Sequence, residues 1–344
     1  PPPPPPTPPH NTLFESSAAS DVYKRQGYRC IKESDEFDRV NAAQQKTITD
    51  ALLHFRLGGV ELEGADRERY QQLQKDLSEL QSSFENNLLD STQSWEYLTE
   101  DESELQGLPD YALAMLRQLA EQKELPGYRV TLDMPCFLAV ITYADNRELR
   151  KSIYEAYVTR ASDCGITDKI WDNAANTRKI VAKRQEKAKL LGFKNYAEYS
   201  METKMAGSVD QVVEFLDDLA KRSQRTAIDE VNERQAFAES LGFEGELNAW
   251  DYPYYSEKLK QDRYRISDED LKPYFADHRV IKGLFDIVAR LYQVEISAVD
   301  DGIDRWDDHV GFYHIKDRQN EVIGQFFLDL YARENKRGGA WMDE

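Results

Sequence analysis

Residues 310–331 read VGFYHIKDRQNEVIGQFFLDLY, and they contain a change of hydrophobic period near the end of the chain. Residues 310–316 alternate between apolar and polar side chains, residues 317–320 supply a polar turn, and residues 322–331 alternate again. A period of two is typical of β-strands, and two such runs joined by a short polar turn predict an antiparallel hairpin.

Upstream of the hairpin, apolar residues recur at three- and four-residue steps, which is the period of an amphipathic helix. One stripe comprises Tyr70, Leu73, Leu77, Leu80, Phe84 and Leu88. A helix after Ser208 has a predicted inner face of Val212, Phe215, Leu216 and Leu219. A later helix has one stripe of Ile281, Leu284, Phe285, Val288, Leu291 and Tyr292. The apolar run 132–143 fits a strand or a helix, so the pattern predicts a mainly α fold, α+β overall, with a small antiparallel sheet near the C-terminal end.

The first 26 residues differ in kind from the rest. Six prolines followed by Thr7, Pro8 and Pro9 form a low-complexity run that favours polyproline II or disorder. The hexapeptide Asp21–Gln26 resembles the in-frame translation of a transposon end used in sequencing adaptors. We therefore interpret residues 1–26 as an assembly artefact and exclude them from the fold prediction, with a natural disordered leader as the alternative.

The charge balance bears on the partners. The chain has 63 acidic and 44 basic side chains, a formal net charge of -19, and such a polyanion is repelled by nucleic acid and by anionic membranes. The basic run 170–191 is interpreted as a solvated helix face that pairs with acidic neighbours, rather than as a nucleic-acid stripe. We expect neither nucleic acid nor membrane as a partner.

The cysteines indicate the compartment. Cys30, Cys136 and Cys164 are an odd and widely spaced set, which is no disulfide framework and favours reduced, buried thiols. No apolar run approaches the roughly 18 residues of a membrane span. We expect a soluble, cytoplasmic protein.

Catalytic motifs are missing from the sequence. None of the five histidines begins a His-Glu-x-x-His pattern, and His309 and His314 are expected to have structural or surface roles rather than to bind metal. There is no nucleophile elbow, phosphate-binding loop or dinucleotide fingerprint. The aromatic run 248–255 is either a wall on which a peptide stacks or, as we favour, an anchor in the core.

Several segments together resemble the thimet oligopeptidase and oligopeptidase A family of zinc metallopeptidases, with the best match to bacterial oligopeptidase A. They are Thr177-Arg178-Lys179, residues 191–199, Ala249-Trp250-Asp251 with Tyr254-Tyr255, residues 324–331 and Lys336-Arg337-Gly338-Gly339-Ala340. The resemblance covers Gly27 to Glu344. It departs from the family at Ala332, where proline is expected.

The resemblance implies a large, mostly helical peptidase fold in which a deep channel admits short, unstructured peptides. We expect a helical region over residues 27–205 and a second over 206–344 that leads into the hairpin at the start of the catalytic part. The family's zinc is held by a His-Glu-x-x-His helix and a later glutamate, and neither occurs up to Glu344. The resemblance therefore implies a fragment of a zinc oligopeptidase, inactive as given, with no catalytic or metal-binding residue to assign.

One site remains as a hypothesis. Small residues beside a channel let an extended peptide approach, so we expect Gly338, Gly339 and Ala340 to line the substrate cleft. Two other hypotheses for the class of protein stay open. One is a metal-free helical homologue that binds peptides or proteins without cutting them, and the other is a self-sufficient helical scaffold. The sequence leaves the oligomeric state open.

Overall fold

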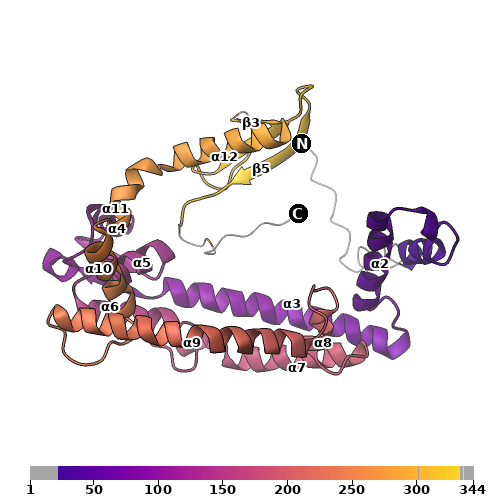
Figure 1. Ribbon diagram of the computed structural model, residues 1–344, viewed down its shortest axis with the longest axis horizontal. Coiled ribbons are helices and arrows are strands. Elements are labelled where there is room, and N and C mark those ends of the chain that lie inside the picture. Colours follow the sequence, from indigo (N-terminus) through magenta and orange to yellow (C-terminus); the bar gives the residue numbers. More distant parts are fainter. Residues whose placement is uncertain (1–21, 301, 334–335, 337–344) are drawn as a thin grey trace, which may run out of the picture. The chain divides into compact units, whose positions relative to one another are not determined.

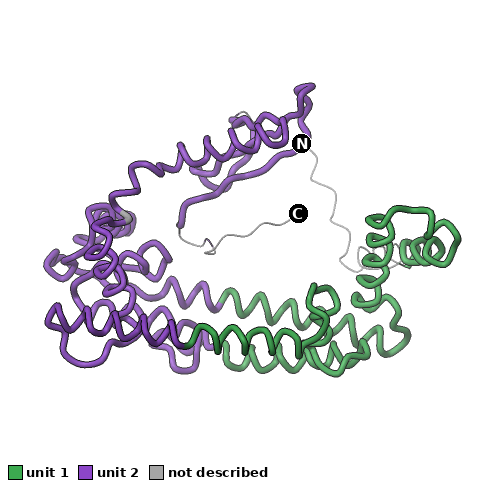
Figure 2. The backbone as a smooth tube through the Cα atoms, viewed as in Figure 1, with its two compact units in different colours: residues 1–86, 173–224 green, residues 87–172, 225–344 purple. Residues whose placement is uncertain are grey.

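The structure is a computed structural model of the 344-residue chain, and it describes residues 22–300, 302–333 and 336. Most of these residues are helical, and two small antiparallel sheets accompany the helices (Figure 1). This confirms the mainly α prediction with a sheet towards the C-terminal end. The chain divides into two compact units, each made of two separate stretches of sequence (Figure 2).

Unit 1 comprises residues 1–86 and 173–224. Its described elements are a helix over residues 22–32, η1 (Phe37–Arg39), α2 (Ala42–Leu57), the first part of α3 (Gly64–Gln93), α7 (Ala174–Leu190), α8 (Tyr196–Met201) and the first part of α9 (Val209–Ser240). The helix α2 begins at a capping box, in which Asn41 accepts the Gln44 N–H and Gln44 accepts the Asn41 N–H. It ends before a glycine pair whose second member, Gly59, has a left-handed φ of 75°.

Residues 22–26, which the sequence assigns to the leader, lie in the helix over residues 22–32. Within unit 1, Arg25 pairs with Glu61, and the Tyr28 ring lies 6.3 Å from the Phe55 ring. These contacts hold the short helix beside α2. The proline run lies outside the described residues.

The helix α3 bears the predicted apolar stripe. Leu73 and Leu77 are buried, and the later members of the stripe are half-buried. The facing helix α7 is the basic run. Lys183 of α7 pairs with Asp76 of α3, and in the opposite sense Arg69 of α3 donates to both Glu186 oxygens of α7 at 2.6 and 2.8 Å. The Lys183 pair supports the interpretation of the basic run as a face that pairs with acidic neighbours.

The first half of α9 differs from its prediction. The helix begins after Ser208, as predicted, and Ser208 caps it by accepting the Gln211 N–H at 3.1 Å. However, Phe215, Leu216 and Leu219 are 63%, 54% and 52% exposed, so the described chain does not bury the predicted inner face.

Unit 2 comprises residues 87–172 and 225–344. After the ends of α3 and α9 its described elements are β1 (Glu96–Thr99), η2 (Glu102–Leu105), α4 (Asp110–Glu121), β2 (Tyr128–Thr131), α5 (Met134–Tyr143), α6 (Arg147–Val158), η3 (Lys169–Trp171), α10 (Tyr252–Tyr264), α11 (Asp268–Leu271), η4 (Lys272–Tyr274), α12 (Asp277–Tyr292), β3 (Glu295–Ala298), β4 (Gly311–Lys316) and β5 (Val322–Leu328).

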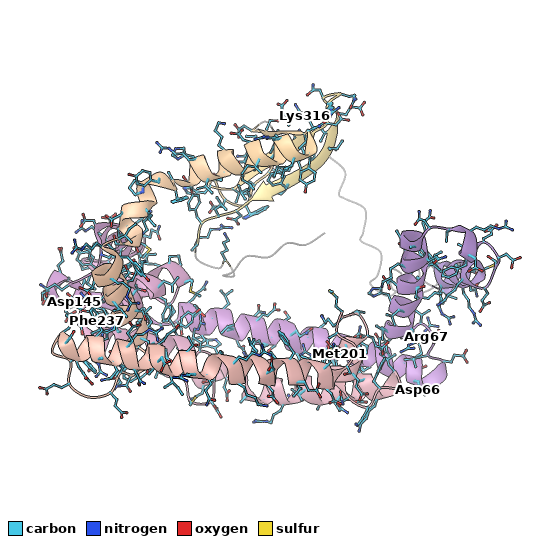
Figure 3. The ribbon with its side chains drawn as sticks, viewed as in Figure 1. Asp66, Arg67, Asp145, Met201, Phe237 and Lys316 are labelled. Carbon is cyan, nitrogen blue, oxygen red and sulfur yellow. The ribbon has the colours of Figure 1, made fainter. Side chains whose placement is uncertain are left out.

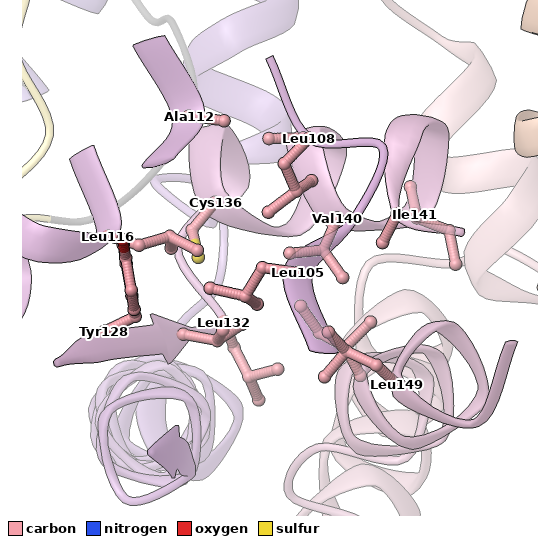
Figure 4. Close-up of a cluster of buried hydrophobic side chains, with 14 of the residues drawn as sticks. Leu105, Leu108, Ala112, Leu116, Tyr128, Leu132, Cys136, Val140, Ile141 and Leu149 are labelled. Carbon is pink, nitrogen blue, oxygen red and sulfur yellow. The ribbon is translucent and has the colours of Figure 1, made fainter. Parts of the chain in front are cut away.

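The main core of unit 2 is formed by α4, β2, α5 and α6 (Figure 4). The ambiguous apolar run becomes the helix α5, with Pro135 in its first turn, where the missing N–H costs nothing. Cys136 packs inside, and burial raises the pKa of its thiol to about 11. The prediction of buried thiols holds for Cys136 but is wrong for Cys30 and Cys164, which are exposed.

A buried ion cluster joins α6 to the start of α10. Asp251 is fully buried and accepts hydrogen bonds from Arg150 Nη2 at 2.9 Å, Arg147 Nη2 at 2.8 Å and the Asn248 N–H at 3.0 Å. Desolvation raises the pKa of Asp251, but the hydrogen bonds outweigh it and lower the pKa overall. The stabilisation is therefore present above the ordinary Asp pKa and is lost as the pH falls towards the lowered one.

The aromatic run packs around this cluster. Tyr255 is buried with Ala238 and Leu247, Trp250 packs against the main core, and the Tyr254 hydroxyl donates to Asp145 at 2.7 Å. Asp145 and Phe237, which borders the Tyr255 cluster, lie in this part of unit 2 (Figure 3). These contacts support the core-anchor interpretation of the run.

The three-stranded sheet has the order β3-β4-β5 and is antiparallel throughout. Asp317 Oδ1 accepts the N–H groups of Gln319 and Glu321, both at 2.9 Å, which closes the turn between β4 and β5. The predicted hairpin is therefore confirmed. The sequence missed the second sheet, in which β1 pairs with β2 from Glu96↔Thr131 to Thr99↔Tyr128. Among the described helices, none is both long and apolar enough to cross a bilayer.

Replacing Asp251 by alanine is expected to lower the free energy of unfolding by about 3–5 kcal/mol, because Arg150 would stay buried without a counterion. Urea unfolding followed by circular dichroism measures the change. Asp286→Ala is the matched control, since its partner Lys282 lies on an exposed helix face and the pair is worth about 0.5 kcal/mol or less. Equal losses in the two variants would contradict the prediction.

Candidate functional site

The candidate site is the stretch of unit 2 that follows β5. The predicted substrate-binding residues Gly338, Gly339 and Ala340 lie outside the described residues. Residues 329–333 and Lys336 precede them in the sequence and are described. The structure therefore shows which contacts fix the chain just before the predicted segment.

Asp329 is the centre of this approach. Its carboxylate accepts two parallel hydrogen bonds from Arg333, at 2.7 and 2.9 Å, and one from the Trp306 indole N–H at 3.0 Å. Lys336 Nζ donates to the Asp329 carboxylate at 3.0 Å and to the backbone carbonyls of Asp329 and Tyr331, both at 2.9 Å. Two cations and an indole therefore fix the chain as it leaves β5.

Further contacts extend the cluster. Arg333 also lies 3.5 Å from the Asp307 carboxylate, which accepts the backbone N–H of His309 at 2.9 Å. The Tyr331 hydroxyl donates to Asp277, at the start of α12. The segment after β5 is thus tied both to the loop before β4 and to α12.

The electrostatics make Asp329 an anchor rather than an acid. Hydrogen bonds from Arg333, and then from Trp306 and Lys336, hold the pKa of Asp329 well below its usual range despite some desolvation. The hydrogen bond to Asp277 and its charge raise the pKa of the Tyr331 hydroxyl. Asp329 therefore carries its charge at neutral pH and has no proton to give to a substrate.

Aromatic side chains line the sheet beside this segment. On one side Phe327 lies 4.6 Å from Phe312 and 4.9 Å from Trp306, ring centre to ring centre, and Trp306 and Phe327 are 58% and 41% exposed. In the described chain β5 pairs with β4 alone, so its other edge keeps free backbone donors and acceptors. An edge of this kind is where an extended peptide adds as a further strand.

The described residues do not offer a metal site. No group of three or more His, Cys, Asp or Glu side chains among them is placed to hold a metal ion. His309 Nδ1 lies 3.0 Å from Asp307, and His314 Nε2 lies 3.0 Å from the Gln325 amide nitrogen. The zinc that the resemblance implies does not fit the described part of the chain, and no chemical step is assigned to it here.

The comparison with known families identifies the class. The model of peptidase family M3 matches residues 140–344, which is more than half of the chain, and the chain belongs to this family. The match includes α6, α10, the three-stranded sheet and the candidate segment after it.

Curated relatives extend the likeness towards the N-terminal side. The chain is 46% identical over 323 residues to oligopeptidase A of Escherichia coli (strain K12), which covers 94% of this chain and 47% of the relative. It is 36% identical over 327 residues to the organellar oligopeptidase A of Arabidopsis thaliana, covering 92% of this chain and 41% of that protein. The chain thus spans a little less than half the length of these relatives.

Asp329→Asn is expected to speed tryptic cleavage after Arg333 and Lys336 by about fivefold. Loss of the charge releases both basic side chains and lowers the local stability of the segment by roughly 1 kcal/mol. Mass spectrometry of a brief trypsin digest measures the rates at these two sites. Asp308→Asn, at an exposed neighbour, is the control and should leave both rates unchanged. Equal rates in wild type and Asp329→Asn would show that the cluster does not hold the segment.

Proposed function

We propose that the chain is part of a zinc-dependent oligopeptidase that hydrolyses short, unstructured peptides in the cytoplasm, and that the chain by itself is inactive. The observation that carries the proposal is the 46% identity to Escherichia coli oligopeptidase A across 94% of this chain, together with the M3 match. The chain covers 47% of that relative, so the activity is proposed for the whole polypeptide.

In this proposal the described residues hold the peptide rather than cut it. The free edge of β5 offers backbone hydrogen bonds to an extended peptide, and Trp306 and Phe327 offer apolar contact close to that strand. The Asp329 cluster fixes the chain after β5, a few residues before the proposed cleft residues Gly338, Gly339 and Ala340 in the sequence. Zinc would supply Lewis acidity for peptide hydrolysis, and we assign its ligands to the part of the relatives that this chain does not match.

The test is a fusion of this chain to the unmatched part of Escherichia coli oligopeptidase A, with a short internally quenched peptide as substrate. We expect hydrolysis by the fusion, its loss on chelation and its return with zinc, and no hydrolysis by the chain alone. A well-folded fusion that is inactive with zinc would contradict the proposal. Peptide binding without cleavage would then favour the metal-free peptide-binding homologue.

In the active fusion, Gly339→Val is expected to raise KM about tenfold, equivalent to ~1.4 kcal/mol of lost binding, because a branched side chain would obstruct the approach of the peptide. Steady-state kinetics on the quenched peptide measure KM and kcat separately. Gly339→Ala adds a single methyl group and should give a smaller change in the same direction. Unchanged kinetics in Gly339→Val would remove this segment from the substrate cleft.

A further inference from the structure

The helix α12 carries two apolar stripes rather than one. The inner stripe, Ile281, Phe285 and Val288, is half-buried. Its Phe285 ring lies 5.1 Å from Tyr313 and 6.0 Å from Phe326, so this stripe packs on the three-stranded sheet. The outer stripe is Val280, Leu284, Ile287 and Leu291, which are 49%, 56%, 59% and 68% exposed.

The outer stripe has the spacing of a helix-packing seam. Its members follow one another at steps of four, three and four residues, the pattern with which one helix packs along another element. Scattered exposed apolar residues are ordinary, but a regular row is not. Exposed Leu271, Tyr274 and Phe275 precede the row in the sequence. Burial of apolar side chains is the dominant favourable term in folding, so an exposed row of this kind leaves a large source of stability unused.

Gly283 gives a second, independent sign of a packing surface. It lies in the interior of α12, where glycine is less favourable than alanine. A Cβ placed on it would meet no atom within 4 Å among the described residues, so neither crowding nor a left-handed φ calls for glycine here. On the helix surface it neighbours Val280 and Ile287 at i−3 and i+4. A glycine at this position allows the backbone of another element to come close to the outer stripe.

The length and charge of the chain favour one partner. The relatives contain about as much polypeptide again as this chain matches, since the match covers 47% of Escherichia coli oligopeptidase A. A second copy of the chain is disfavoured, because each copy carries a formal charge of -19. We propose that the outer stripe of α12 is the face on which the unmatched half of the M3 polypeptide packs.

The identity of this partner rests on the family assignment and the proposed function. The readout of the test is burial, not hydrolysis, so the two proposals can fail separately. An active fusion whose outer stripe stays exposed would overturn this inference alone. A buried stripe in an inactive fusion would overturn the proposed function alone.

The test places a cysteine at Leu284 and compares its alkylation rate in the chain alone and in the fusion. Peptide mapping by mass spectrometry separates this thiol from the native ones. We expect the rate for Leu284→Cys to fall at least tenfold in the fusion. Val181→Cys is the matched control, since Val181 is a helical apolar residue with 61% exposure, and its rate should be the same in both proteins.

Two further measurements keep the inference testable if the fusion misfolds, and show whether a second copy of the chain buries the stripe instead. Adding the unmatched half as a separate polypeptide should slow labelling of Leu284→Cys in the chain as its concentration rises. Sedimentation of the chain alone should give a monomer. Protection of Leu284→Cys by a dimer of the chain would overturn the inference, as would full reactivity in both the fusion and the mixture.

Discussion

The structure of unit 2 depends on one buried carboxylate. Asp251 is fully buried, and it can remain charged there only because Arg150, Arg147 and a backbone N–H share its charge. The two partners that matter most, Asp251 and Arg150, are about a hundred residues apart in the chain. Their pairing fixes where α10 begins relative to α6 and the core. The chain that continues through α12, the sheet and the candidate segment therefore starts from a defined point.

The sequence predicted the elements whose pattern is local. The stripe of α3 and the alternation of β4 and β5 both lie within continuous runs, and each was confirmed. The sheet of β1 and β2 was missed because each strand has four residues and the two are far apart in sequence, so neither run shows a clear period. The Asp251–Arg150 pair was not predicted either, because its two residues are far apart in the sequence. A single sequence gives no signal for a contact that long-range folding creates.

The candidate site was predictable in part. Asp329 and Arg333 are four residues apart and carry opposite charges, so the sequence alone could have predicted a local ion pair between them. The third partner, Trp306, comes from the loop before β4, and nothing in the sequence connects it to Asp329. The small residues Gly338, Gly339 and Ala340 remain a prediction from the resemblance and from their size.

The pattern of α12 shows what periodicity does and does not determine. Ile281, Phe285 and Val288 point about 100° around the helix from the row formed by Val280, Leu284 and Ile287, because neighbouring residues differ by that angle. The sheet contacts one arc of the helix and leaves the adjacent arc exposed. The sequence pattern correctly predicted a helix with a broad apolar arc, but the prediction treated that arc as a single stripe. An arc wider than the sheet covers is best explained by two packing partners, and a sequence pattern records both without distinguishing them.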